Sequence, residues 1–366
     1  MSAGNAHWVV PQAAHDALVT AAFAARGFEP DEVAAMVKVC GEAARHGIRT
    51  HNAIKALHLD DLFGSRVGGC VPGAAVEVLP VRFPAARVWN AHRKLGPGVA
   101  YAAMDTCVAI AREQGVGMVS VDEAWHYLWG GAYVLEAARQ GFIGYTNCTA
   151  MLAEVVPFGG RRPALGTNPH SWAFPTRTSI GFPVLIDFAT SSAAMGRVQQ
   201  LGREGRPLPS GWAVDADGNE TRDPARASAL LPFGGHKGYG LGLVDELFAA
   251  FIGGGRPTVR GRFPSSDASK RTPSFHFMAI HPEAVSGGRW EAGLDRDANV
   301  KAVVSDILGP GNEGALLPGQ LEHEAAQRCA RAGGLLFTDS EMDAFDAIAS
   351  ACGQPAWDRS ALARAD

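Results

Sequence analysis

The apolar side chains of this chain follow two kinds of repeat, one helical and one extended. After Pro30, apolar residues fall at positions i, i+3, i+4 and i+7, which predicts a helix with one buried face. Further along, a helical pattern ends at Gly115 and again at Gly141, and a short apolar run follows each time, over 116–121 and 142–147. This alternation of helix and strand predicts an α/β layer.

The stretch 230–254 combines a glycine-rich turn with the pattern of a buried helix. Three glycines surround His236 and Lys237, and an apolar stripe then repeats at spacings of about 3.6 residues. The stripe consists of Leu241, Val244, Phe248 and Phe251. A helix start with a lysine beside it presents unpaired N–H groups and positive charge, which predicts a site for a phosphate or a carboxylate. The alternative is a glycine-rich turn into a core helix, because the spacing matches neither standard nucleotide-binding motif.

Residues 50–58 predict another helix, with Thr50 as its N-cap. This spacing places His51, Lys55 and His58 on one face of the helix, so three basic side chains share one side. A solvated surface and a basic functional site are both compatible with the pattern, and the residues alone favour the solvated surface.

His126 lies in the loop 122–131, just past the carboxyl end of a predicted strand. Sites in α/β sheets form at such loops, although a packed residue between aromatic neighbours is the alternative. The nearby stretch 115–120 superficially resembles a dinucleotide-binding loop. We reject a Rossmann assignment because this stretch precedes a strand instead of following one.

Asp187 interrupts the continuous apolar run 182–188, which predicts a fully buried strand. A carboxylate in such a strand must be paired or hydrogen-bonded, and small donors follow it at 189–192. Asp187 therefore either meets a ligand or caps a helix predicted over 193–198.

Three further segments complete the pattern. The Gly-, Arg- and Ser-rich segment 253–273 predicts a mobile excursion, and 274–281 alternates like a strand. Pro318-Gly319-Gln320 precedes a predicted helix over 321–332 and again places backbone N–H groups at a helix start.

Composition narrows the class of protein. The chain has 366 residues and a net charge of -4, so its composition does not indicate the excess of basic residues that is typical of proteins that bind nucleic acid. We expect no membrane span and no signal peptide, and therefore a cytoplasmic protein. The six cysteines have no C-x-x-C spacing, so we expect neither a disulfide nor a zinc site.

Several motifs, in order along most of the chain, resemble the malate/L-lactate dehydrogenase family that lacks a Rossmann fold. Relatives of that family include ureidoglycolate and sulfolactate dehydrogenases, diketogulonate reductase and cyclic ketimine reductases. The matching motifs are Gly47-Ile48-Arg49-Thr50-His51, Val155-Val156-Pro157-Phe158-Gly159-Gly160, Gly166-Thr167-Asn168-Pro169, Ile186-Asp187-Phe188-Ala189-Thr190-Ser191, Leu231-Pro232-Phe233-Gly234-Gly235-His236-Lys237-Gly238-Tyr239-Gly240, and Pro318-Gly319-Gln320.

The resemblance implies an α/β fold with a central mixed sheet and flanking helices. It implies an enzyme that uses NADH or NADPH to interconvert a small-molecule 2-oxo acid and 2-hydroxy acid, assembled as a homodimer. A mainly helical domain would comprise residues 1–115 and 310–366, and a central cofactor-binding domain residues 116–309.

The resemblance also implies roles for particular residues. His51 matches the acid/base histidine, Lys55 a carboxylate-binding arginine, and His126 a second active-site histidine. The cofactor-binding positions would be Asp187, Phe188, Ala189, Thr190, His236, Lys237, Pro318, Gly319 and Gln320.

Some positions depart from the family's pattern and leave the substrate open. Asn52 replaces a glycine, and the loop 125–129 is bulkier than usual. Lys55 replaces an arginine and therefore lacks the bidentate hydrogen bonding of a guanidinium to a carboxylate. Residues 148–154 have no position-by-position match. One alternative is a reductase of cyclic imino acids from the same family, and another is a relative that binds nucleotide without turnover. A metal-dependent hydrolase or lyase that uses His51, His126 and Asp187 is the alternative from a different class.

Overall fold

A seven-stranded sheet forms the centre of the computed structural model, which describes residues 7–252 and 272–365. The strand order is β2-β3-β4-β11-β5-β6-β7, and the pairs are antiparallel except for β3 with β4. The strands are β2 (Glu77–Leu79), β3 (Ala86–Asn90), β4 (Val116–Asp122), β5 (Ile143–Cys148), β6 (His170–Phe174), β7 (Val184–Phe188) and β11 (Phe275–Ile280). The predicted α/β layer with a mixed central sheet is therefore confirmed.

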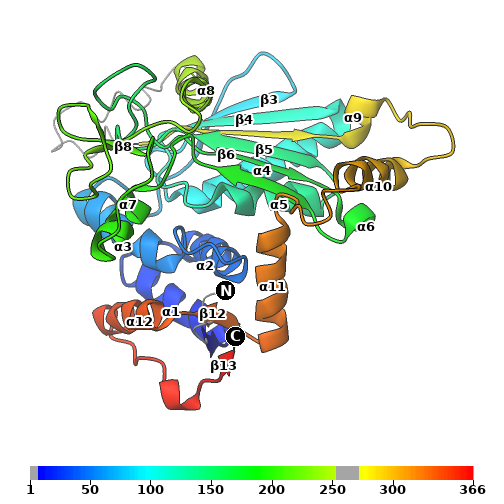
Figure 1. The fold of residues 1–366 in the computed structure, drawn as a ribbon. Helices are drawn as coiled ribbons and strands as arrows, with labels where there is room; N and C mark the ends of the chain where they lie inside the picture. The colour runs from blue at the N-terminus through cyan, green and yellow to red at the C-terminus, as the bar shows by residue number, and fades with distance from the viewer. Residues whose placement is uncertain (1–6, 253–271, 366) are drawn as a thin grey trace.

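Two helices, α4 (Gly96–Gln114) and α5 (Gly130–Arg139), cover one face of this sheet (Figure 1). Alternate strand residues such as Val119, Phe275 and Phe277 point toward these helices and are fully buried. Each such side chain contributes about 1.5–3 kcal/mol to folding. This burial holds the strands in place, and with them the loops that leave the strand ends.

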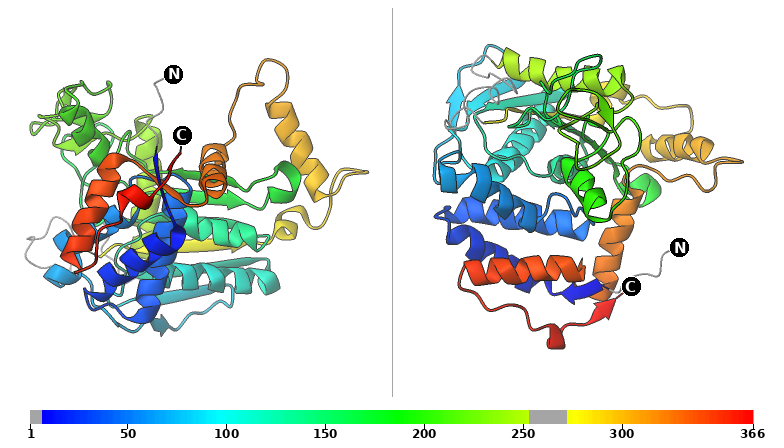
Figure 2. Two further views of the ribbon diagram at one scale, coloured as in Figure 1. Left: turned by 90° about the horizontal axis from the view of Figure 1, so that it is seen from below. Right: turned by 60° about the vertical axis from the view of Figure 1, so that its left-hand side comes forward.

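Both ends of the chain join in a second, mainly helical layer below the sheet (Figures 1 and 2). Strand β1 (His7–Val10) pairs with β12 (Leu335–Phe337) and with β13 (Arg364–Ala365). The helices of this layer are α1 (Gln12–Ala24), α2 (Pro30–Arg45), α3 (Ala53–Phe63), α11 (Gln320–Ala332) and α12 (Asp339–Ala351). Helix α2 is the helix predicted after Pro30, and Glu29 and Glu32 form a capping box at its start.

The remaining elements lie beside the sheet. A small sheet of order β10-β8-β9 has its own apolar cluster with helix α7, and α10 projects from the body of the molecule (Figure 2). These elements are α6 (Arg177–Ile180), α7 (Met195–Arg203), β8 (Ala213–Val214), β9 (Glu220–Thr221), β10 (Ala229–Leu230), α8 (His236–Phe251), α9 (Pro282–Ser286) and α10 (Arg296–Ile307).

Three local predictions were wrong. Asn52, and not Thr50, is the N-cap of α3, because its side-chain oxygen accepts hydrogen bonds from the backbone N–H groups of Ile54 and Lys55. His51 therefore precedes the helix and does not share a helix face with Lys55 and His58.

The other two wrong predictions concern burial. The strand within 182–188 is the edge strand β7, so Asp187 is exposed, and no side chain caps the helix that follows. In α8, Phe251 of the predicted stripe is 87% exposed, whereas Asp245 and Glu246 face inward. Asp245 turns inward because it pairs with buried His170, with Oδ1 and Nε2 3.1 Å apart. The excursion predicted over 253–273 falls outside the described residues, apart from its last two.

Candidate active site

His51 is held at the start of α3 with one ring nitrogen engaged. Thr50 Oγ1 lies 2.9 Å from His51 Nδ1, and the adjacent Asn52 is buried while it caps the helix. Within the described residues, His51 Nε2 has no protein partner. The helix start thus fixes the orientation of the imidazole and leaves its outer nitrogen available to a ligand.

His126 reaches the same space from the loop between β4 and α5. The backbone N–H of Leu128 donates to His126 Nδ1 over 3.1 Å, and the Gly96 N–H donates to the Trp125 carbonyl. Trp125 itself is only 2% exposed. The loop is therefore anchored to the start of α4, and the other ring nitrogen of His126 remains without a partner in the described part of the chain.

The electrostatics show that Lys55 lies close to both histidines. Burial, together with the smaller effect of the positive charge of Lys55, lowers the pKa of His51 to about 4. Burial likewise lowers the pKa of His126 to about 3, with smaller effects from His51 and Lys55. The structure therefore brings together the three residues that the sequence proposed for catalysis, with both imidazoles neutral and able to accept a proton at neutral pH.

Asp187 is held by two buried donors, Ser171 and Trp129. Ser171 Oγ donates to Asp187 Oδ1 over 2.5 Å, and Trp129 Nε1 donates to Oδ2 over 3.1 Å. Although solvent reaches Asp187, protein atoms surround its carboxyl group, so burial raises its pKa and the two donors oppose the rise. Trp129 ends the loop that carries His126, and its bond thus joins that loop to β7.

The other proposed cofactor positions lie along β7 and at its two ends. At the start of the strand, the Leu185 N–H donates to the Pro318 carbonyl over 3.3 Å, and Gly319 adopts a left-handed φ of 86° just before α11. At the other end, the Thr190 carbonyl accepts from the Phe233 N–H over 3.0 Å in the turn that leads into α8.

The residues present fit an extended anionic cofactor along this strand. Neither α8 nor α11 has a side-chain cap. At the start of α8 the Lys237 and Gly238 N–H groups donate to backbone carbonyls, which leaves the His236 N–H for an anion among the described residues. At the start of α11 the Leu321 and Glu322 N–H groups have no partner in the described part of the chain. His236 and Lys237 are exposed at the first of these starts. Leu185 and Thr190 are five residues apart, which spans roughly 17 Å in an extended strand. Phe188 and Ala189 are half-buried between the two ends.

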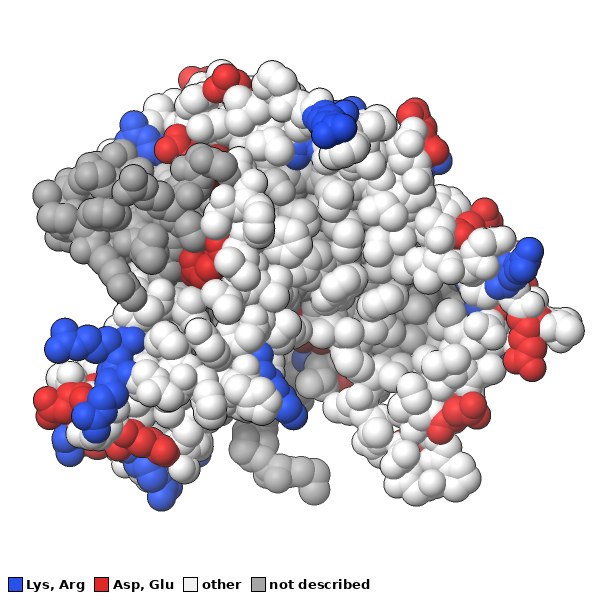
Figure 3. Space-filling view, turned by 90° about the horizontal axis from the view of Figure 1, so that it is seen from above, with Lys and Arg blue, Asp and Glu red and all other residues white. Residues whose placement is uncertain are grey.

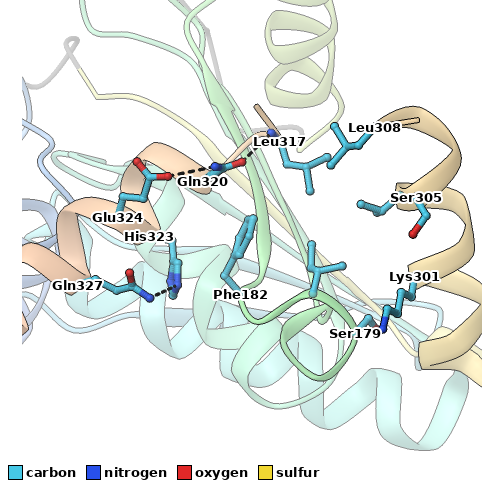
Figure 4. A pocket seen from close by; sticks show the side chains of 12 residues that line it. Ser179, Phe182, Lys301, Ser305, Leu308, Leu317, Gln320, His323, Glu324 and Gln327 are labelled. Atoms are coloured by element: carbon cyan, nitrogen blue, oxygen red, sulfur yellow. Dashed lines mark hydrogen bonds between the residues drawn. The ribbon is translucent and has the colours of Figure 1, made fainter. Parts of the chain in front are cut away.

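A cavity of about 440 Å³ adjoins the start of α11 (Figure 4). Gln320 lines it and donates to Glu324 over 3.0 Å, and the Phe182 and His323 rings stack with centroids 5.1 Å apart. Lys301 of α10 lines the opposite side. The cavity therefore continues from one end of β7 and mixes apolar, aromatic and polar walls.

Sequence reasoning missed Ser171 and Glu154, and it named Trp129 as part of the bulky loop 125–129 without its bond to Asp187. Trp129 and Ser171 hold Asp187, and Glu154 is half-buried with a pKa that burial raises and the charge of Lys55 lowers. Glu154 ends the segment that could not be matched position by position. The sequence signal that could have indicated Glu154 is a carboxylate directly before two apolar residues, Val155 and Val156.

The metal-site alternative finds no support among the described residues. No group of three or more histidine, cysteine or acidic side chains is arranged to hold a metal ion there. Asp187 is already engaged by Trp129 and Ser171. The six cysteines, all described, are free thiols.

The mixed sheet, which lacks the Rossmann arrangement, and the cluster of His51, His126 and Lys55 fit an oxidoreductase. The malate/L-lactate dehydrogenase family model matches residues 10–345. The chain belongs to this family. It is a dehydrogenase or reductase that acts on 2-oxo and 2-hydroxy acids.

Individual relatives support this assignment. The Δ1-pyrroline-2-carboxylate/Δ1-piperideine-2-carboxylate reductase of Pseudomonas syringae pv. tomato is 36% identical over 64% of this chain and 67% of that protein. The L-sulfolactate dehydrogenase of Methanocaldococcus jannaschii is 35% identical over 70% of this chain and 73% of its own length. The solved structure of the sulfolactate dehydrogenase from this organism superposes with a TM-score of 0.77 at 26% identity, and covers 95% of this chain and 98% of that one.

None of the helices within residues 7–252 and 272–365 is both long enough and apolar enough to cross a membrane.

Proposed function

We propose that this chain uses NADH or NADPH to reduce a 2-oxo acid to the 2-hydroxy acid, and catalyses the reverse oxidation with the oxidised cofactor. The observation that carries the proposal is the cluster of His51, His126 and Lys55, because the loop of His126 is joined to β7 by the hydrogen bond from Trp129 to Asp187. The bound nicotinamide supplies the hydride that reduces C2 of the oxo acid.

In this proposal His51 moves the proton. Its free Nε2 donates a proton to the carbonyl oxygen during reduction and accepts one from the hydroxyl during oxidation, so that one proton accompanies each hydride. Neutral His51 is ready for the oxidation direction. For reduction, a substrate carboxylate beside Lys55 offsets the lysine charge and thereby favours the imidazolium form.

Lys55 binds the substrate carboxylate, and His126 orients the carbonyl group. The Lys55 ammonium has no carboxylate within 4.0 Å in the described part of the chain, which leaves it available to an anionic substrate. Trp125 and Trp129, each 2% exposed, exclude water from the walls of the site.

The residues that would hold the cofactor lie along β7 and at its two ends. The His236 N–H and the Lys237 side chain at the start of α8 would hold the phosphates, Asp187 would bind the nicotinamide side, and Pro318, Gly319 and Gln320 would bind the other end. The cavity beside Gln320 is large enough for part of a nucleoside.

The functional unit in this proposal is a cytoplasmic homodimer. An apolar row, paired residue to residue, crosses five strands on the sheet face opposite α4 and α5, and few charges surround it (Figure 3). The row consists of Met118, Met278, Tyr145, Trp172 and Ile186. A second copy that covers this face would bury a surface of the kind found in obligate dimers.

We also propose that the two layers are separate domains, a helical domain from both chain ends and a central cofactor domain. Strands β2 and β3 and helix α4 belong with the sheet, so the first boundary would lie before residue 77 and not at residue 115.

The test is to follow the nicotinamide absorbance with NADH or NADPH and a panel of pyruvate, oxaloacetate, sulfopyruvate and piperideine-2-carboxylate. Oxidation of the cofactor with an oxo acid supports the proposal. Tight cofactor binding with no turnover on a broad panel would instead favour a nucleotide-binding relative without activity.

A further inference from the structure

His170 and Asp245 form a buried polar contact beneath helix α8 that the proposed reaction does not use. His170 lies on β6 and Asp245 on α8, which covers the sheet face opposite α4 and α5 (Figure 1). The two side chains are 3% and 1% exposed, and His170 Nε2 lies 3.1 Å from Asp245 Oδ1. A buried pair of this kind is seldom more stabilising than apolar residues of the same size, so stability alone does not account for it.

Contacts on both sides of the imidazole fix the plane of the His170 ring. Tyr145 Oη lies 2.8 Å from His170 Nδ1 and itself accepts a hydrogen bond from Asn147 Nδ2 over 2.9 Å. On the other side of the ring, Nε2 lies 3.2 Å from the Leu241 carbonyl oxygen and beside Asp245. Burial lowers the pKa of His170, so the imidazole is neutral at neutral pH. The neutral tautomer with its proton on Nε2 accepts from Tyr145 and donates toward α8, which locks the ring between β5 and α8.

The locked ring supports Phe188, one of the residues proposed to hold the cofactor. His170 and Phe188 are paired neighbours on β6 and β7, and their rings stack with centroids 5.7 Å apart and planes 15° apart. Phe233, in the turn before α8, packs against Phe188 in a T-shaped arrangement with centroids 5.6 Å apart. The Phe188 ring is therefore held between one ring from β6 and another from the turn into α8.

These contacts set the position of the start of α8 relative to the end of β7. Asp245 ties the middle of α8 to β6, and the contact of Phe188 with Phe233 joins β7 to the turn that opens the helix. The proposed cofactor contacts the same two elements, with Asp187 on β7 and the His236 N–H at the start of α8. A ligand that reaches both groups binds well only when the two elements keep a fixed separation.

We propose that His170 is a positioning residue for the cofactor site: it holds Phe188, and with it the end of β7, at the spacing from α8 that the cofactor requires. Asp245 orients the His170 ring, and neither residue touches the reacting atoms. The inference rests on the proposed function, because the spacing matters for binding only when one ligand contacts both β7 and α8.

The experiment measures the Kd of NADH and NADPH by fluorescence titration in His170→Leu and in a matched control, His276→Leu. His276 is a buried histidine on the same sheet face, and its ring stacks on Phe248 of α8 with centroids 4.2 Å apart. It lies on β11, however, with β5 and β6 between it and β7.

Both substitutions should lower the thermal unfolding midpoint, because each leaves a cavity under α8. His170→Leu alone should raise the cofactor Kd, by about tenfold, as expected for the loss of one good contact. The kcat at saturating cofactor should stay close to that of the wild-type protein, since the proton-transfer groups are unchanged.

Three more variants separate the positioning role from a general loss of stability. His170→Phe keeps a ring against Phe188 and loses the polar contacts, so its unfolding midpoint should fall while its Kd stays close to that of the wild type. Asp245→Ala removes the partner on α8 and should also raise the Kd. Asp245→Asn keeps an oxygen beside His170 Nε2 and should not raise it.

An unchanged Kd in His170→Leu, or an equal rise in His276→Leu, would overturn the inference, because the contact would then support the fold alone. If His170→Leu does not fold, an unchanged Kd in Asp245→Ala has the same consequence. These results leave the proposed function intact, since the wild-type protein still binds and uses its cofactor. If the wild-type protein binds neither NADH nor NADPH, the proposed function itself fails, and this inference fails with it.

Discussion

Gly238, in the first turn of α8, packs against the backbone that follows β7 and cannot accept a side chain. A Cβ added at Gly238 would lie 2.5 Å from the Thr190 carbonyl oxygen, 2.7 Å from the Phe233 oxygen and 2.8 Å from the Phe233 nitrogen. All three are backbone atoms, so the first turn of α8 must move away from the end of β7. Gly238→Ala should therefore destabilise the protein by about 1–3 kcal/mol, as overpacking does in protein cores.

Gly240, two residues further along the same helix, is the matched control. A Cβ there meets nothing within 4 Å, so Gly240→Ala should stabilise the protein by about 0.5–1 kcal/mol through helix propensity. Urea unfolding measures both changes, and titration of NADH or NADPH fluorescence measures binding. We expect weaker cofactor binding in Gly238→Ala alone. Equal stability and equal binding in the two variants would refute the idea that this contact positions α8.

Two further predictions concern the site itself. The kcat/KM for oxidation of a 2-hydroxy acid should increase as the pH rises through about 4, because neutral His51 is the base. Lys55→Met should move this increase to higher pH, because it removes the charge that lowers the His51 pKa. A pH profile that does not move in Lys55→Met would contradict this electrostatic coupling. Trp129→Phe removes a donor to Asp187, so the pKa of Asp187 should rise further and cofactor affinity should fall by about three- to tenfold, measured as Kd. An unchanged Kd would show that Asp187 takes no part in cofactor binding.

The alternation of helix and strand was readable from the sequence because burial imposes it locally. Glycine stops such as Gly115 and Gly141 mark where a helix must end, and the structure has strands directly after both. Burial in α8 was not readable in the same way. The face of α8 that turns inward is set by the pairing of Asp245 with His170, which lies 75 positions earlier in the chain. The local spacing of apolar residues gives no sign of such a distant partner.

The site was predictable in part. His51, Lys55 and His126 were named from motifs, and the structure brings them together. The shared helix face predicted for His51, Lys55 and His58 was wrong because Asn52 caps α3 and His51 precedes the helix. The position of Glu154 was not predictable, because its backbone is held by Leu165 and by Leu230, which lies 76 positions later in the chain. Such a contact between separated segments leaves no periodic pattern in the sequence.

The most direct test of the central claim is the steady-state reduction of a 2-oxo acid by His51→Ala, with His58→Ala as its control. His58 lies on α3 and is exposed, so its loss should leave turnover unchanged. His51→Ala should lower kcat by about 10²–10⁴-fold, the contribution of a general acid, and leave the Kd of NADH or NADPH close to that of the wild type. Turnover by His51→Ala equal to that of the wild-type protein would contradict the account.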